Sequence, residues 1–224
     1  MYYSNRKTYD AELLELDTRL ARMGHAACGA IEQALTALKT GDVELARRVI
    51  AGDSEINSAE HEVEHQCLSL ILRQQPVAGD LRKVSTALKT VTDIERIGDQ
   101  ASDIAEIVLH LHPEHAGTVG VLEDIYKMGD MVLKMVKDAI GAYVQADLAS
   151  ANEIKRRDDD IDAAFTRISH EIAGYIAANP DQAESALDLF MITKYFERLG
   201  DHAVNVAEWV EFLKTGVHKS EKIV

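Results

Sequence analysis

The sequence ERIGDQASDIAE (residues 95–106) recurs late in the chain as ERLGDHAVNVAE (residues 197–208), and this pair of segments shows how the chain is organised. The match continues outward from both segments at an offset of 105 residues before Pro76 and of 102 residues after it. Aligned pairs include Met23 and Met128, Gly24 and Gly129, Asp42 and Asp147, Asp53 and Asp158, and Ile56 and Ile161. The second half is therefore a copy of the first, with three residues missing from one turn.

Each half reads as three long helices, because apolar residues recur at three- and four-residue steps over windows that few prolines interrupt. In the first half these windows are residues 10–39, a second ending at Gln75, and 80–111. Gly41 can close the first helix and Asp42 can cap the next. Amphipathic helices must bury their apolar stripes against neighbours. We therefore predict an all-α fold of two tandem three-helix bundles, residues 1–113 and 114–224, with a linker at residues 115–118.

Composition excludes several classes of function. The chain has 224 residues, of which 46% are hydrophobic and 28% charged, a balance typical of folded globular proteins. Its formal charge of -14 repels phosphate backbones, so direct nucleic-acid binding is not expected. The two cysteines form no Cys-x-x-Cys pair, which fits a reducing cytoplasm. With neither an apolar signal core nor a membrane-spanning apolar run, we expect a cytoplasmic protein without membrane insertion.

The repeated segments carry rows of carboxylates. Glu95, Asp99 and Asp103 follow one another at four-residue steps and so form a slowly winding row on one helix, which Glu106 rejoins. Like charges at this spacing cost an isolated helix about 0.2–0.5 kcal/mol per pair. The apolar stripe of Ile94, Ala101, Ala105 and Val108 runs beside the row, so the acids border a packing seam. A cation would offset the repulsion.

Glycines and a second helix complete the pattern. Gly98 and Gly200 each cost about 1 kcal/mol in a helix interior relative to alanine, which is accepted where another backbone or a bound group comes close. We expect the second helix of each half to approach there. That helix carries Asp53 and Asn57 in the first half, and Asp158 and Asp162 in the second. The facing rows would form an oxygen-rich site in each half.

Oxygen-only ligands suit hard cations such as Mg²⁺, Ca²⁺ and Mn²⁺, and carboxylates in helical bundles also hold iron. We predict a metal site in each half, with its metal unidentified. The alternative is a solvated helix face paired with Arg96 and Arg198. The predicted ligands are Glu95, Asp99, Asp103, Glu197, Asp201, Asn205, Asp53, Asp158 and Asp162.

The segment His61-Glu62-Val63-Glu64-His65 satisfies the His-Glu-x-x-His pattern of zinc proteases, with Glu62 as the potential general base. Its repeat partner at residues 166–170 keeps only the last histidine, and no third ligand motif follows. Glu62 and His65 would also match half of a di-iron site, but a second Glu-x-x-His is missing. A solvated helix face therefore remains the main interpretation, and a zinc protease the minor alternative.

The duplicated Glu-Arg-Ile/Leu-Gly-Asp segments, together with QPVAGDLR (residues 75–82), resemble the PhoU family of phosphate-transport accessory proteins over nearly the whole chain. The resemblance implies a cytoplasmic, non-enzymatic regulator that couples a phosphate ABC transporter, through its ATPase subunit, to a phosphate-sensing histidine kinase. Such a regulator keeps the phosphate-starvation response off when phosphate is plentiful. It also implies a homodimer.

The family resemblance further implies bound metal, in some members as multinuclear iron or zinc clusters, at the Glu/Asp-x-x-x-Asp motifs. Together with the oxygen chemistry of the ligands, this leaves iron, zinc, magnesium and manganese as the candidate ions. The matching positions here are Glu95, Asp99, Asp103, Glu197, Asp201 and Asn205. Asn205 departs from the motif, and Asn57 opposite Asp162 is a second break in symmetry. Because an amide is a weaker cation ligand than a carboxylate, we expect unequal sites in the two halves. A metal-independent helical adaptor is the alternative function.

Overall fold

The computed structural model describes residues 2–111, 121–219 and 221–222, and it confirms the predicted all-α fold of six long helices. The predicted linker at 115–118 lies outside the described residues, and the division into two domains stays a prediction. The helices, in chain order, are α1 (Tyr2–Thr40), α2 (Val43–Gln74), α3 (Ala78–Val108), α5 (Leu122–Gln145), α6 (Leu148–Ala178), the short 3-10 helix η2 (Pro180–Gln182) and α7 (Ala183–Thr215).

Capping residues end and start the helices where the sequence places them. The side chain of Asp42 accepts a hydrogen bond of 2.9 Å from the backbone amide of Leu45, and its copy Asp147 accepts one of 2.9 Å from Ala149. These carboxylates satisfy amides that a helix start leaves unpaired. Helix α1 begins at Tyr2, earlier than predicted, because no glycine or proline interrupts residues 2–10.

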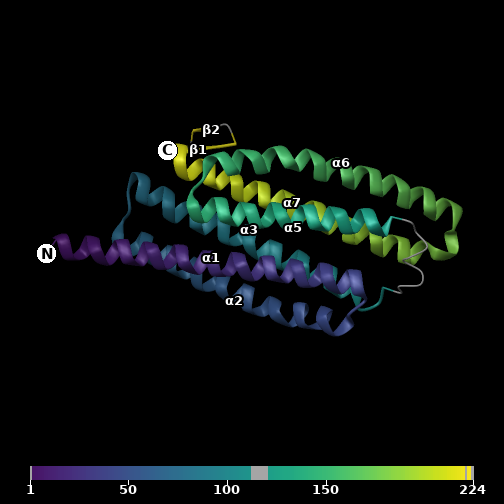
Figure 1. The fold of residues 1–224 in the computed structure, drawn as a ribbon. Coiled ribbons are helices and arrows are strands. Elements are labelled where there is room, and N and C mark those ends of the chain that lie inside the picture. The colour runs from purple at the N-terminus through teal and green to yellow at the C-terminus, as the bar shows by residue number, and fades with distance from the viewer. Residues whose placement is uncertain (1, 112–120, 220, 223–224) are drawn as a thin grey trace.

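Four helices form the centre of the molecule (Figure 1). Helices α1 and α3 of the first half pack against α5 and α7 of the second, while α2 lies outside α1 and α3, and α6 lies outside α5 and α7. The buried apolar side chains of both halves belong to one continuous cluster. The halves therefore pack against each other through a shared core. Among the described residues, no helix is long and apolar enough to cross a membrane.

Glycines mark the contact between α1 and α5. A methyl group built on Gly24 would lie 2.7 Å from Cγ2 of Ile140, and one built on Gly129 would lie 2.8 Å from Cδ1 of Leu35. Gly24 and Gly129 are copies of each other at the 105-residue offset, and so are Leu35 and Ile140. The two contacts are thus related by an approximate two-fold axis, and α1 and α5 run antiparallel.

The C-terminal end folds back on α7 as a small hairpin that the sequence did not predict. Strand β1 (Val217–His218) pairs antiparallel with β2 (Glu221–Lys222). The imidazole of His218 stacks on the indole of Trp209, the one tryptophan of the chain, with ring centroids 3.9 Å apart. Lys219 lies 3.5 Å from a carboxylate oxygen of Glu208. The hairpin therefore covers the end of the second acidic row.

Replacing Gly129 with alanine is expected to destabilise the protein. The new methyl group would lie 2.8 Å from both Leu35 and the ring of Phe196, which is fully buried. Overpacking costs about 1–3 kcal/mol, which outweighs the gain of about 1 kcal/mol from helix propensity. Gly141→Ala is the control, because its methyl group would meet no atom within 4 Å and should stabilise the helix. Urea unfolding of both variants checks this, and equal effects would contradict the packing account.

Candidate metal centres

Each acidic site forms where an outer helix approaches a central one at a glycine, as the sequence predicted. A methyl group on Gly98 of α3 would lie 3.0 Å from Ile56 and 3.5 Å from Oδ1 of Asp53, both on α2. A methyl group on Gly200 of α7 would lie 3.4 Å from Oδ1 of Asp158 on α6. Gly98 thus makes room for Ile56, and in both halves the carboxylate of the outer helix lies at ordinary van der Waals distance from the methyl position of the glycine.

The first-half cluster brings together acids from α2 and α3. Burial, and then repulsion from Asp99, raises the pKa of Glu95, whereas Arg96 opposes the shift. The pKa of Asp53 is raised by burial and by Asp99, against a hydrogen bond from Asn57. Burial also raises the pKa of Asp103, with repulsion from Glu106, Asp99 and Asp53. These carboxylates are close enough to disfavour one another's charge, so the cluster lacks positive charge.

Glu60 belongs to the same cluster, although the sequence analysis missed it. Burial raises its pKa, and Asp99 is among the acids that add to the shift. Its copy in the second half is Phe165, so the repeat gave no signal for it. Its position on α2, seven residues after Asp53 and hence two turns along the same face, could have found it.

Several oxygens of the first cluster have no hydrogen-bond donor. Asp53 Oδ1, Asn57 Oδ1 and Glu95 Oε2 are buried and accept no hydrogen bond from any described residue. The amide of Asn57 does donate to the other Asp53 oxygen, at 2.9 Å. Arg96 supplies one positive charge, 3.0 Å from Asp99 and 3.4 Å from Glu95. Arg198 also acts on Asp103, but the carboxylates of the cluster still outnumber these two guanidinium groups.

The second-half cluster repeats this arrangement between α6 and α7. Burial raises the pKa of Asp158 to about 6, with repulsion from Asp162, Asp201, Asp159 and Glu197. Loss of water contact and the charge of Glu197 raise the pKa of Asp201 as well, and Lys194 opposes this shift. Lys194 pairs with Glu197 at 2.6 Å. This cluster, too, has more carboxylates than cations.

Two of the predicted ligands, Asn205 and Asp103, face the seam between α3 and α7. The Asn205 amide donates to Asp93 Oδ1 at 3.0 Å, and Nδ1 of His202 lies 2.9 Å from the same oxygen. Burial, and then the negative charge of Asp103, raises the pKa of the Tyr195 hydroxyl, so Tyr195 lies beside Asp103, which also remains near Asp99 and Asp53. Sequence reasoning missed Asp93, Tyr195 and His202. Asp93 and Tyr195 occupy equivalent positions in the two copies, two residues before Glu95 and Glu197. This polar position next to the repeated segments is the feature of the sequence that could have indicated them.

The potential ligand atoms suit a hard cation, because the buried oxygens that accept no hydrogen bond are carboxylate and amide oxygens. In residues 2–111, 121–219 and 221–222, however, no three His, Cys, Asp or Glu side chains converge closely enough to hold an ion in their present rotamers. Binding would require these side chains to rotate toward a common point. The predicted ligand sets and the identity of the metal stay predictions.

The His61–His65 segment lies on the outer side of α2, along a groove of about 530 Å³ shared with α1. His61 is 78% exposed. Glu62, the general base of the protease alternative, is held by Arg19 at 3.0 Å. A zinc protease needs its glutamate free to take a proton from water. This contact, on an open surface, disfavours the protease alternative.

The metal-free protein is expected to lose stability as the pH rises from about 4 to 7. Because the folded protein raises the pKa of Asp158 from 3.8 to about 6, it binds this proton more tightly than the unfolded chain does, and that advantage vanishes above pH 6. After screening we expect a loss of about 1 kcal/mol. Urea unfolding with a chelator at pH 5 and pH 7 measures it. Asp158→Asn should flatten the dependence and the exposed Asp160→Asn should not; equal slopes would contradict the assignment.

Known proteins resemble this chain in both sequence and fold. The family model described as PhoU domain matches residues 20–108 and 125–210. A protein of Clostridium acetobutylicum named "Phosphate-specific transport system accessory protein PhoU homolog" is 37% identical and aligns over 94% of this chain and 96% of its own length. A Caulobacter vibrioides protein of the same name is 34% identical, over 94% and 91% respectively.

Two crystal structures agree with the fold. PhoU from Pseudomonas aeruginosa superposes with a TM-score of 0.85 at 30% identity, covering 93% of this chain and 100% of that one. The "phosphate transport system regulatory protein PhoU" from Streptococcus pneumoniae also gives 0.85, at 28% identity over 96% and 99%. With the duplicated helix triplets and the paired acidic rows, these similarities lead to one conclusion: the chain belongs to the PhoU family.

Proposed function

We propose that this protein is a metal-binding regulator of phosphate uptake that acts in the cytoplasm. It would keep the phosphate-starvation response off by coupling the ATPase subunit of a phosphate ABC transporter to a phosphate-sensing histidine kinase, without being an enzyme. Full-length similarity to proteins named as accessory or regulatory components of phosphate transport supports the regulatory role. A homodimer is part of the same proposal.

The observation that supports metal binding is the repeated carboxylate cluster beside a glycine. In both halves a carboxylate of the outer helix rests on the central helix, next to acids that disfavour one another's charge. In the first half, Asp53, Glu95, Asp99 and Asp103 would hold the ion; in the second, Asp158, Asp162, Glu197 and Asp201 would. A divalent cation would supply the positive charge that these clusters lack and so stiffen the surface they form.

The double variant Asp99→Ala, Asp201→Ala is expected to lose most of the metal that the wild-type protein carries. Each substitution removes a carboxylate from the middle of one row, and fewer anionic oxygens bind a hard cation less tightly. Elemental analysis of untagged protein, purified without chelators, measures the metal per chain. The matched control is Glu55→Ala, Asp160→Ala, because these exposed acids occupy equivalent positions in the two halves outside the clusters. Equal metal contents in the two double variants would refute the site.

The same Asp99→Ala, Asp201→Ala variant is expected to relieve repression of phosphate-starvation genes in phosphate-rich medium. The reason is that a cluster without its ion loses the stiffened surface offered to partner proteins. A reporter gene of the starvation response, in cells whose own copy is deleted, measures this. Full repression by the variant, at normal protein levels, would separate signalling from metal binding.

A metal-independent adaptor is the second candidate function, and the absence of a ready-made three-ligand group in the described part of the chain favours it. An adaptor would retain the transporter ATPase and the kinase after exhaustive chelation. A regulator that depends on metal would release at least one of them. Capture of both purified partners, with and without chelator, distinguishes the two.

A further inference from the structure

The two halves of the chain meet along two antiparallel seams that share one approximate two-fold axis. Along α1 and α5, the contact of Gly24 with Ile140 is mirrored by that of Gly129 with Leu35. Along α3 and α7, the contact of Asp93 with Asn205 is mirrored by that of Tyr195 with Asp103. Because the halves are near-copies, a half could in principle pair with a second copy of itself through the same surface.

Polar residues break the symmetry of the α3 and α7 seam. Asp93 on α3 accepts a hydrogen bond from Asn205 on α7, and Asp103 on α3 lies beside Tyr195 on α7 and raises the pKa of its hydroxyl. His202, also on α7, contacts the Asp93 oxygen as well. The side chains of Asp93 and His202 are only 14% and 17% exposed, so water screens this end of the seam little. Helix α3 therefore supplies the carboxylates of this seam, and α7 supplies side chains that carry no negative charge.

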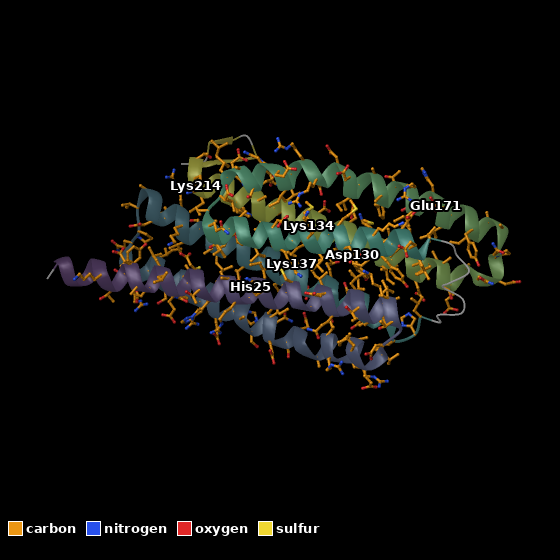
Figure 2. All side chains as sticks on the ribbon, viewed as in Figure 1. His25, Asp130, Lys134, Lys137, Glu171 and Lys214 are labelled. Atoms are coloured by element: carbon orange, nitrogen blue, oxygen red, sulfur yellow. The ribbon has the colours of Figure 1, made fainter. Side chains whose placement is uncertain are left out.

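A charge pair breaks the symmetry of the α1 and α5 seam, which faces the viewer in Figure 2. Lys137, labelled there on α5, contacts Glu32 of α1 at 2.9 Å. These two residues are copies of each other at the 105-residue offset, so the pair lies at the two-fold axis itself. A residue at this position meets its own copy, and the two copies carry opposite charges.

We infer that these polar pairs select the partner of each half, directing the first half onto the second half of this chain and against a second copy of itself. Two first halves in the same geometry would place Asp93 against Asp103 at both ends of the seam, and Glu32 against Glu32. Two second halves would oppose Lys137 to Lys137. Like charges set directly opposite one another are a known device for rejecting a wrong partner. The asparagine that breaks the repeated motif at position 205 thus serves the seam.

The test is a double-mutant cycle in the full chain. Asn205→Asp places a second carboxylate against Asp93, and at pH 8 it should lower the folding equilibrium constant about ten-fold or more. Asp93→Asn combined with Asn205→Asp restores a donor and an acceptor with their places exchanged, and should recover most of the loss. Urea unfolding with a chelator present measures all four proteins, so cation binding does not enter.

Asn152→Asp, at an exposed position of α6, is the matched control and should leave stability nearly unchanged. The inference would be overturned if Asn205→Asp left the free energy of unfolding unchanged. It would also be overturned if the double variant were no more stable than the sum of the two single-variant losses predicts. If Asn205→Asp fails to fold, a folded double variant supports the inference and an unfolded one refutes it. In the same cycle for the other seam, Glu32→Lys and Lys137→Glu should each lower stability, and the two substitutions together should recover most of the loss. The effect should be smaller, because both side chains are about half exposed.

Discussion

The antiparallel packing of α3 on α7 is the contact on which the rest of the structure depends. It joins the two halves into one core, since the apolar stripes of both helices are buried at once. It also fixes the faces that these helices turn outward, and therefore where their acidic rows lie. With α3 and α7 placed, α2 packs tightly on α3 at Gly98, and α6 packs on α7 beside Gly200.

This arrangement holds carboxylates together against their mutual repulsion. Burial of apolar surface in the shared core provides the favourable free energy of folding, while the acids at its edge lose water and raise one another's pKa. Single cations such as Arg96 and Lys194 offset only part of this cost. Proteins keep such unfavourable groups mainly where function requires them, and here that reasoning supports the proposed metal sites.

Much of the fold could be predicted from the sequence, because a pattern in one half could be checked at the equivalent positions of the other half. The period of the apolar residues gave the helices, and Ile94, Ala101, Ala105 and Val108 are buried as expected. The interior glycines foretold the close approach of a second helix. Helical periodicity, however, fixes which face a residue occupies and not which distant helix covers that face. The repeat therefore predicts Asp103 and Asn205 as members of acidic rows, but it holds no information on their neighbours in the opposite half or on the four-helix centre that joins the halves.

The pair of Glu32 and Lys137 at the two-fold axis also bears on the history of the chain. In an ancestral homodimer of single-repeat subunits, the residue at this point would have contacted the same residue of the other subunit. Any charge at this position would therefore have been placed beside an identical charge. Once both repeats are encoded in one gene, the two positions can mutate independently. Substitutions of opposite charge could then accumulate one at a time, and each would make a return to identical subunits less favourable. Gene fusion followed by such substitutions is therefore difficult to reverse.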